Sequence, residues 1–223
     1  ATSRPRSRLS RPDGGRLYQF LGCSTFSEYT VCSVYQLARI NKRAPPGRVS
    51  LLGCSVATGL GAVLNVAQVE DGATAAVFGI NTAGLAVVEA LRISNASRII
   101  ALDMSSTRLD QARAWGATDC INLSSQVEHP SAVIGQLLGS GVDYAFDCIG
   151  SAAVSSAALE SCNEGWGTTV LLGAGSESSA PAASITQSQI LKGKVLKGAL
   201  LGGYRGRAEI PLLVEKYMLG QFR

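Results

Sequence analysis

The stretch Val77-Phe78-Gly79-Ile80-Asn81-Thr82-Ala83-Gly84-Leu85 joins a run of apolar residues to a segment with helical spacing. The run that ends at Phe78 is short and apolar, which is typical of a buried strand. Gly79 allows a tight turn after this strand, and Gly84 allows the following helix to pack closely on it. The stretch therefore predicts a strand, a tight turn and a helix in direct succession.

The same succession repeats toward the C-terminus, where short apolar strands alternate with longer helical stretches. The predicted strands are residues 74–78, 98–102, 119–122, 143–147 and 168–172, and the predicted helices are residues 83–92, 108–115, 132–138 and 153–162. Strands that are connected through helices lie parallel in one sheet. The alternation therefore predicts an α/β fold, a doubly wound parallel sheet with helices on both faces.

The pattern is different upstream of the turn at residues 71–72. Residues 18–40 are rich in β-prone side chains, and residues 28–31 are the clearest strand. Residues 49–54 indicate a second short strand, and residues 58–69 have helical spacing. We interpret the first part as the end of a β-rich unit and the helix as its link to the parallel-sheet domain.

Composition limits the classes of partner. Only 16% of the 223 residues are charged and 46% are hydrophobic, against an average of roughly 25% charged, which favours a buried subunit interface. Part of the net charge of +4 comes from residues 1–16, which are a nucleic-acid contact, part of a transit peptide, or simply a terminus. No aromatic residue is interleaved there, and no apolar stretch is long enough to span a bilayer. We expect a soluble, cytoplasmic protein that binds neither nucleic acid nor membrane.

The chain has six cysteines and one histidine. The cysteines are widely scattered and form no C-x-x-C pair, so we expect reduced thiols that lie mostly in the core. His129 is the sole histidine. This chain alone therefore cannot supply a metal site that needs two histidines.

The turn also carries candidate binding residues. It reads G-x-N-x-x-G instead of the dinucleotide-binding fingerprint G-x-G-x-x-G, so Asn81 stands where the backbone approaches a pyrophosphate. We expect its side chain to crowd that group, and the turn to survive because asparagine tolerates unusual backbone angles. Asp103 follows Gly84 by 19 residues, at the end of the next strand. An acid there accepts hydrogen bonds from the adenosine ribose and selects NAD over NADP.

Two alternatives remain at this site. Arg108 either closes over the same ribose or is a solvated side chain in the first turn of a helix. A G-x-x-x-x-G spacing followed by an acid also arises by chance. Here the strand, the helix and the acid all agree, which favours nucleotide binding at Gly79, Asn81, Gly84, Asp103 and Arg108.

By itself, Cys54 is typical of a buried thiol, because free cysteine is among the most buried residue types. The chain, however, resembles the zinc-dependent medium-chain alcohol dehydrogenases, and most closely class III, the S-(hydroxymethyl)glutathione dehydrogenases. The resemblance covers residues 12–223. It is carried by residues 22–31, 52–54, 58–62, 96–100, 103, 116–122, 141–144, 147–150, 165–167, 197–198 and 202–203.

The resemblance implies NAD-dependent hydride transfer beside a catalytic zinc ion, with a primary alcohol or S-(hydroxymethyl)glutathione as the small-molecule substrate. It implies that Cys54 is a zinc ligand and that Thr58 and Ala83 lie near the nicotinamide. Further residues on the nicotinamide side would be Ile149, Gly173 and Ala174. It also implies a homodimer joined through the sheet edge at residues 195–201.

The resemblance divides the chain into three parts. Residues 1–55 are expected to be a remnant of a β-rich, GroES-like catalytic domain, residues 56–199 the NAD-binding Rossmann domain, and residues 200–223 the start of a return to the catalytic domain. The other zinc ligands of the family belong to a segment before the start of this sequence. A second interpretation therefore stays open: a non-catalytic NAD-binding or dimerisation module, or a truncated product.

Overall fold

The computed structural model describes residues 9–173 and 185–223. Its centre is a six-stranded sheet in the order β5-β4-β3-β6-β7-β8, and all neighbouring strands are parallel. The strands are β3 Thr74–Phe78, β4 Arg98–Asp103, β5 Asp119–Asn122, β6 Tyr144–Asp147, β7 Thr168–Leu171 and β8 Val195–Gly198. The order runs outward from β3 in both directions, so the predicted doubly wound sheet is confirmed.

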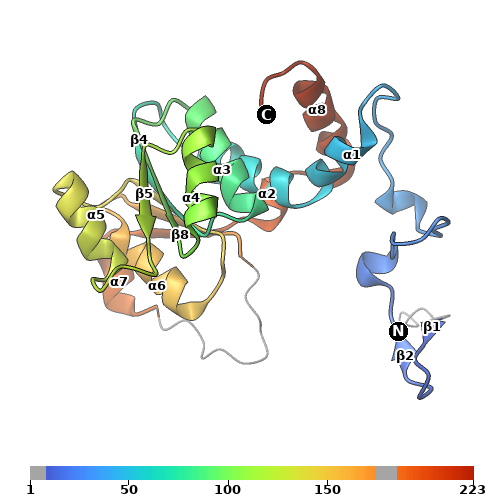
Figure 1. Cartoon of the computed structure of the whole chain (residues 1–223), viewed down its shortest axis with the longest axis horizontal. Coiled ribbons are helices and arrows are strands. Elements are labelled where there is room, and N and C mark those ends of the chain that lie inside the picture. The colour runs from blue at the N-terminus through green and yellow to red at the C-terminus, as the bar shows by residue number, and fades with distance from the viewer. Residues whose placement is uncertain (1–8, 174–184) are drawn as a thin grey trace.

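Helices cover both faces of this sheet (Figure 1). The helices are α3 Thr82–Ile93 and α4 Ser106–Trp115 on one face, and α5 Pro130–Leu138 and α6 Ala152–Ser161 on the other. Successive residues of a strand point to opposite faces. Val77 accordingly belongs to the core cluster under α3 and α4, whereas Phe78 belongs to the cluster under α5 and α6.

The remaining helices are α1 Pro46–Val49, α2 Ser55–Gly61, α7 Gln187–Leu191 and α8 Gly206–Met218. The predicted helix 58–69 is confirmed in part: α2 begins earlier, continues as a wider π-type turn over Ala62–Ala67, and stops at Gln68 in the left-handed region. α2 packs directly on α3. Figure 1 shows α1, α2 and α8 gathered beside the sheet.

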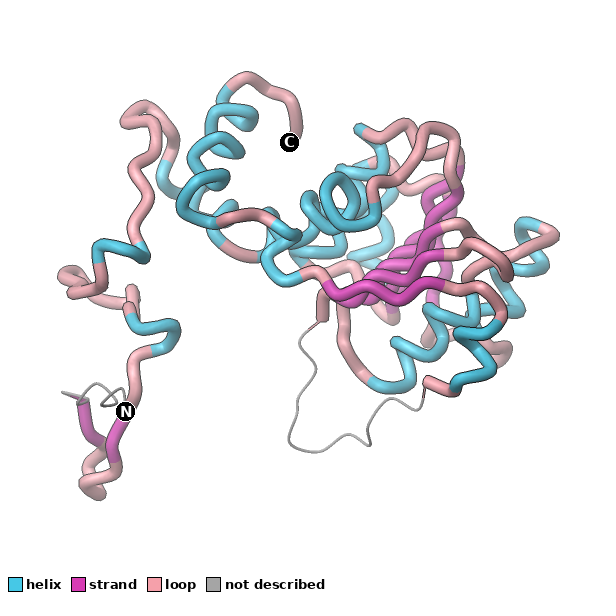
Figure 2. Tube along the Cα trace, turned by 180° about the vertical axis from the view of Figure 1, so that it is seen from behind, coloured by secondary structure: helices cyan, strands magenta, loops and turns pink. Residues whose placement is uncertain are grey.

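The strand expected over residues 28–31 is not formed. A hairpin of two-residue strands, β1 Leu9–Ser10 and β2 Arg16–Leu17, is followed by short 3-10 turns, and Figure 2 shows the whole segment as an arm beside the body. Tyr29 is 92% exposed. A strand needs a hydrogen-bonding partner and an apolar cover, and no described strand pairs with residues 28–31. Local β propensity alone was therefore misleading.

The strand expected over residues 49–54 is also wrong. Val49 ends α1, and Ser50–Gly53 form a 3-10 turn. Pro46 at the first helical position favours the helix, and periodicity cannot separate a strand from a helix in so short an apolar run. Cys54 consequently lies at the start of α2 and is exposed, which contradicts its interpretation as a buried thiol.

All six cysteines are free, as expected, but the expectation that most of them lie in the core is wrong. Only Cys148 and Cys162 are buried. Among the described residues, no single helix is long and apolar enough to cross a membrane. Residues 46–53 and 55–67 pass this test only together, across a bend of 58°.

A half-buried carboxylate ties the two central strands to the following loops. Asp143 Oδ2 accepts hydrogen bonds from Thr74 N at 2.9 Å and Thr74 Oγ1 at 2.8 Å. Its Oδ1 accepts from Trp166 Nε1 at 2.9 Å and Asn163 Nδ2 at 3.2 Å. Burial alone raises the pKa of Asp143, but the bonds from Trp166 and Thr74 outweigh it and the pKa is lowered. The ionised carboxylate therefore stabilises the start of β3.

We expect Asp143→Asn to lower the free energy of unfolding at pH 7 by about 2 kcal/mol, since hydrogen bonds to charged groups each contribute about that much. A lowered folded pKa adds stability above the unfolded value of about 3.9 and loses it as the pH falls through the folded value. The difference between the two proteins should therefore shrink toward pH 3. Urea unfolding at both pH values measures it; an equal difference at both would contradict this role.

Candidate functional site

The ends of three neighbouring strands meet at one edge of the sheet. Gly79 N donates to Leu102 O at the end of β4 (2.8 Å), and Cys148 N donates to Phe78 O at the end of β3 (3.0 Å). The connections from β3 and β6 leave in opposite directions, and ligands of such sheets bind in the crevice outside the carboxyl ends of these strands. The structure thus brings together the turn at residues 79–84, the loop at 103–108 and the loop at 148–150.

Both glycines of the turn are required by its geometry. Gly79 has φ +90°, and a Cβ there would overlap the Ile149 side chain. A Cβ on Gly84 would overlap the carbonyl oxygen of Gly79. The sequence interpretation of these two positions, a tight turn and a close approach of α3 to β3, is confirmed.

We expect Gly84→Ala to destabilise the fold by about 3 kcal/mol, because the added methyl group meets backbone that cannot move aside easily. The matched control is Gly135→Ala in α5, where an added Cβ meets nothing within 4 Å. That change should be neutral or raise stability by up to about 1 kcal/mol, since alanine is the better helix former. Thermal unfolding compares the two variants; equal midpoints would show that the turn tolerates the methyl group.

Asn81 is the N-cap residue of α3. Its Oδ1 accepts hydrogen bonds from Ala83 N and Gly84 N, each at 3.0 Å, and its Nδ2 donates to Cys148 O at 2.8 Å. Its backbone is extended, with φ −88° and ψ −170°. The turn forms as expected, but the tolerance of asparagine for unusual backbone angles is not needed, because the positive φ belongs to Gly79. The side chain is thus held by bonds at both ends.

Asp103 ends β4 with its side chain only 7% exposed. Oδ2 accepts from Ile80 N at 2.7 Å, and Oδ1 accepts from Ser105 N at 2.9 Å. Arg108 Nη1 lies 3.7 Å from Oδ2, so the two side chains predicted at one site do lie together. A carboxylate oxygen accepts two hydrogen bonds. Each oxygen of Asp103 therefore keeps acceptor capacity for a ligand hydroxyl.

The β6 side of this sheet edge contains residues that sequence reasoning missed. Asp147 is fully buried; its Oδ1 accepts from Ile149 N at 2.9 Å and Gly150 N at 2.8 Å, and its Oδ2 from Ser155 Oγ at 2.7 Å. These bonds fix the loop that carries Ile149. Gly173 lies against the backbone of Ile149. An acid at the end of a strand, the same signal that identified Asp103, could have identified Asp147.

The remaining candidates lie on the start of α2 and α3. Thr58 Oγ1 donates to Cys54 O at 3.0 Å. The next residue, Gly59, touches the backbone of Ala83, so the α2 candidates lie beside the start of α3. Ala174 lies outside the described residues.

The described residues bring together no complete donor set for a metal ion. Within residues 9–173 and 185–223, no group of three or more His, Cys, Asp or Glu side chains is placed to hold a metal. His129 precedes α5 at its N-cap position, where its Nδ1 lies 2.8 Å from Ser131 Oγ and its Nε2 3.7 Å from Glu160 Oε2. A zinc ion needs three protein ligands at a catalytic site. Cys54 with the other described side chains does not meet that need.

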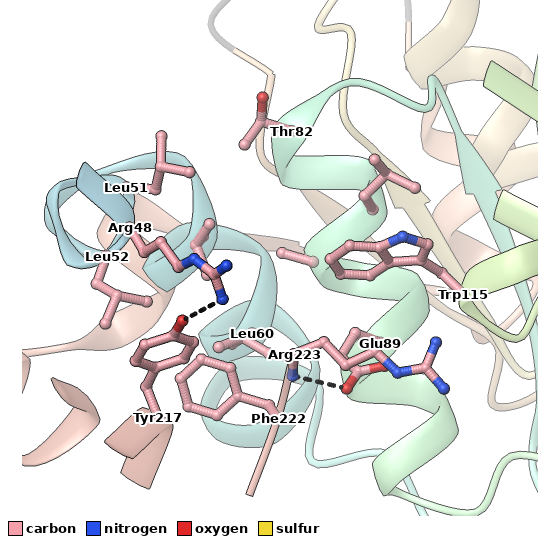
Figure 3. Close-up of a pocket in the computed structure, with 13 residues that line it drawn as sticks. Arg48, Leu51, Leu52, Leu60, Thr82, Glu89, Trp115, Tyr217, Phe222 and Arg223 are labelled. Atoms are coloured by element: carbon pink, nitrogen blue, oxygen red, sulfur yellow. Dashed lines mark hydrogen bonds between the residues drawn. The ribbon is translucent and has the colours of Figure 1, made fainter. Parts of the chain in front are cut away.

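A separate hollow lies between α2, α3 and α8 (Figure 3). Its volume is about 330 Å³, and its walls are mostly apolar, with Leu60 and Trp115 among them. Arg48 Nη1 donates to Tyr217 Oη at 3.4 Å on one side of it. It shares only Thr82, the first residue of α3, with the turn at residues 79–84.

The geometry defines a class: a doubly wound sheet with a glycine turn and an anchored acid at the neighbouring strand end, as in dinucleotide-binding domains. Residues 83–217 match the family of zinc-binding dehydrogenases. Because this match covers more than half of the chain, the chain belongs to that family. The resemblance to the zinc-dependent alcohol dehydrogenases is thereby confirmed.

Individual relatives support the same assignment to the family. The chain is 44% identical to alcohol dehydrogenase class-3 of Myxine glutinosa over 93% of its length, and 45% identical to that of Oryza sativa over 96%. It is 45% identical to an S-(hydroxymethyl)glutathione dehydrogenase of Escherichia coli over 93%. It spans only 55–56% of the length of these relatives.

Solved structures of the same fold include an alcohol dehydrogenase zinc-binding domain protein from Burkholderia ambifaria, with a TM-score of 0.81 and 32% identity. It is matched over 96% of this chain and 57% of that protein. Benzyl alcohol dehydrogenase from Acinetobacter calcoaceticus has a TM-score of 0.83 and 27% identity, over 96% and 59%. Both comparisons support the assignment of fold.

Proposed function

We propose that this chain is the coenzyme-binding part of an NAD-dependent alcohol dehydrogenase of the class-3 type. The observation that carries the proposal is Asp103, held by Ile80 N and Ser105 N at the end of β4, beside the turn at Gly79. Its free acceptor capacity suits the two ribose hydroxyls of NAD, and its charge repels the 2′-phosphate of NADP. Arg108, 3.7 Å from the same carboxylate, would lie over that ribose.

The nicotinamide end of the coenzyme is proposed to lie between α2 and the β6 loop. Thr58 and Ala83 would contact it from one side, and Ile149, Gly173 and Ala174 from the other. The placement of Gly59 against Ala83, and of Gly173 against Ile149, supports this for the described residues. Bound NAD would accept or give up the hydride, and these residues would orient its ring.

The substrate of the complete protein is proposed to be S-(hydroxymethyl)glutathione or a primary alcohol, since relatives with these names match almost the whole chain. Cys54 is proposed as one zinc ligand; the described residues bring no second and third ligand to it. We propose the domain division 1–55, 56–199 and 200–223 on the same resemblance, and a cytoplasmic location. The incomplete ligand set favours a second candidate, a non-catalytic NAD-binding module.

Titration of the purified 223-residue chain with NADH and with NADPH, followed by the fluorescence of the reduced nicotinamide, tests the coenzyme proposal. We expect saturable binding of NADH and at least tenfold weaker binding of NADPH, because a like charge beside the ribose phosphate is repulsive. Equal affinities would remove Asp103 from the ribose site. The absence of binding by either coenzyme would overturn the proposed function.

The chain is further proposed to form a homodimer through β8. This strand is the last in the sheet order, and Leu200, two residues after its end, is 93% exposed. An uncovered apolar edge strand is an aggregation hazard unless a partner covers it. A second copy pairing with β8 would provide that cover.

We expect Leu200→Glu to convert the dimer into monomer at tens of micromolar, because a buried unpaired charge is strongly unfavourable. The matched control is Val127→Glu, a fully exposed apolar residue beyond β5 at the opposite edge of the sheet, which should leave the mass unchanged. Light scattering measures both. A parent chain that is already monomeric would contradict the proposed interface.

A further inference from the structure

The amide groups of the second and third residues of α3 already have a hydrogen-bonding partner. In doubly wound folds, the start of the helix after the first strand offers its free N–H groups to the coenzyme diphosphate. Here the amides of Ala83 and Gly84 both donate to Asn81 Oδ1 at 3.0 Å. The side chain of Asn81 therefore stands where the diphosphate oxygens are expected.

This side chain cannot be turned aside without loss. Its Nδ2 donates to Cys148 O at 2.8 Å, which ties the start of α3 to the loop after β6. A flip of the side-chain amide would exchange Oδ1 and Nδ2. Nδ2 would then face the N–H groups of Ala83 and Gly84, and Oδ1 would face the carbonyl oxygen of Cys148, so that no hydrogen bond could form at either end. A diphosphate that takes these amides must displace Asn81 Oδ1 and break both of the bonds that this oxygen accepts.

The carboxylate at the end of β4, where the ribose is proposed to bind, is not fully occupied in this way. Asp103 uses one bond on each carboxylate oxygen and keeps its remaining acceptor capacity. Arg108 Nη1 lies 3.7 Å from Asp103 Oδ2 and places a positive charge beside this loop. The two parts of the site therefore differ in the groups that they offer to a ligand. The carboxylate of Asp103 has acceptor capacity for a ribose, whereas the amides of Ala83 and Gly84 are already bonded to Asn81.

We propose that Asn81 is an intramolecular competitor of the diphosphate, so that the adenosine moiety provides most of the affinity of this site. The inference rests on the proposed coenzyme function and deepens it, because it assigns a specificity-determining role to one side chain. The diphosphate then adds little to binding. The chain consequently discriminates poorly between adenosine and larger adenosine diphosphate derivatives.

Calorimetric titration of the 223-residue chain with adenosine and with ADP-ribose tests the inference. In the parent, ADP-ribose should bind within about threefold of adenosine. In Asn81→Gly, ADP-ribose should bind about 30-fold more tightly than in the parent, because two charge-assisted bonds become available, while adenosine affinity stays unchanged. Glycine at an N-cap disturbs a helix little. Asn81→Ala should give the same ligand response, which separates the removed side chain from added backbone freedom.

The matched control is Asn95→Gly, the same substitution two residues beyond the other end of α3, where φ is already +57°. It should leave both affinities unchanged. If adenosine binds but Asn81→Gly and Asn81→Ala do not tighten ADP-ribose, the inference is overturned and the proposed coenzyme function stands. If neither ligand binds to the parent or to any variant, both are overturned.

Discussion

Replacement of Asp103 by alanine is expected to weaken NADH binding about 30-fold, because a hydrogen bond to a charged acceptor is worth about 2 kcal/mol. NADPH binding should not weaken, because the carboxylate that repels its 2′-phosphate is gone. The preference for NADH over NADPH should therefore disappear. Fluorescence titration with both coenzymes measures this change.

Two further variants separate the possible causes of that loss. Asp103→Asn keeps oxygen acceptor capacity for the amides of Ile80 and Ser105 but removes the charge, so it should relax the discrimination while retaining part of the NADH affinity. Asp110→Ala removes an exposed acid of α4 that pairs with Arg113 at the surface, and should change neither affinity. An Asp103→Ala protein that still rejects NADPH as strongly as the parent would contradict the ribose contact.

The second large effect concerns the zinc content of the chain and its turnover of alcohols. We expect the 223-residue chain to retain far less than one zinc ion per chain after dialysis, and NADH production with alcohols or with formaldehyde plus glutathione to stay at background. A catalytic zinc needs three protein ligands, and the described residues provide no such group. Without the zinc, the Lewis acid that polarises the substrate oxygen is missing.

Zinc analysis by plasma emission and a spectrophotometric assay measure this result. Cys54→Ser serves as the control, and should match the parent in both zinc content and background rate. Stoichiometric zinc together with turnover that Cys54→Ser abolishes would contradict the prediction. It would mean that the chain recruits ligands that the fold does not bring to Cys54.

The strands and helices from Thr74 to Leu171 could be predicted from sequence, because strand and helix periods alternate there with glycine turns between them. The structure of the segment before Thr74 could not be predicted. Residues 28–31 have strand composition, but a strand depends on a partner that local sequence does not identify. α8 was not predicted either; it contains Pro211, which normally ends a helical pattern.

The site was predictable to a similar extent. The positions of Gly79 and Gly84 in the turn and of Asp103 at the end of β4 could be predicted, because they follow from backbone geometry at a fixed spacing. The role of Asn81 could not be predicted, because an asparagine at this position can either crowd a ligand or cap a helix. The choice depends on Cys148 O, which is 67 residues away in the sequence and 2.8 Å away in the fold. Only the tertiary structure joins these two groups.

We propose that a nucleotide binds where β3, β4 and β6 end. Backbone amide chemical shifts of the isotope-labelled chain, recorded during titration with NADH, test this claim most directly. We expect the changes to concentrate at residues 79–84, 103–108 and 148–150. No shift at saturating NADH, or shifts confined to the opposite edge of the sheet, would contradict it.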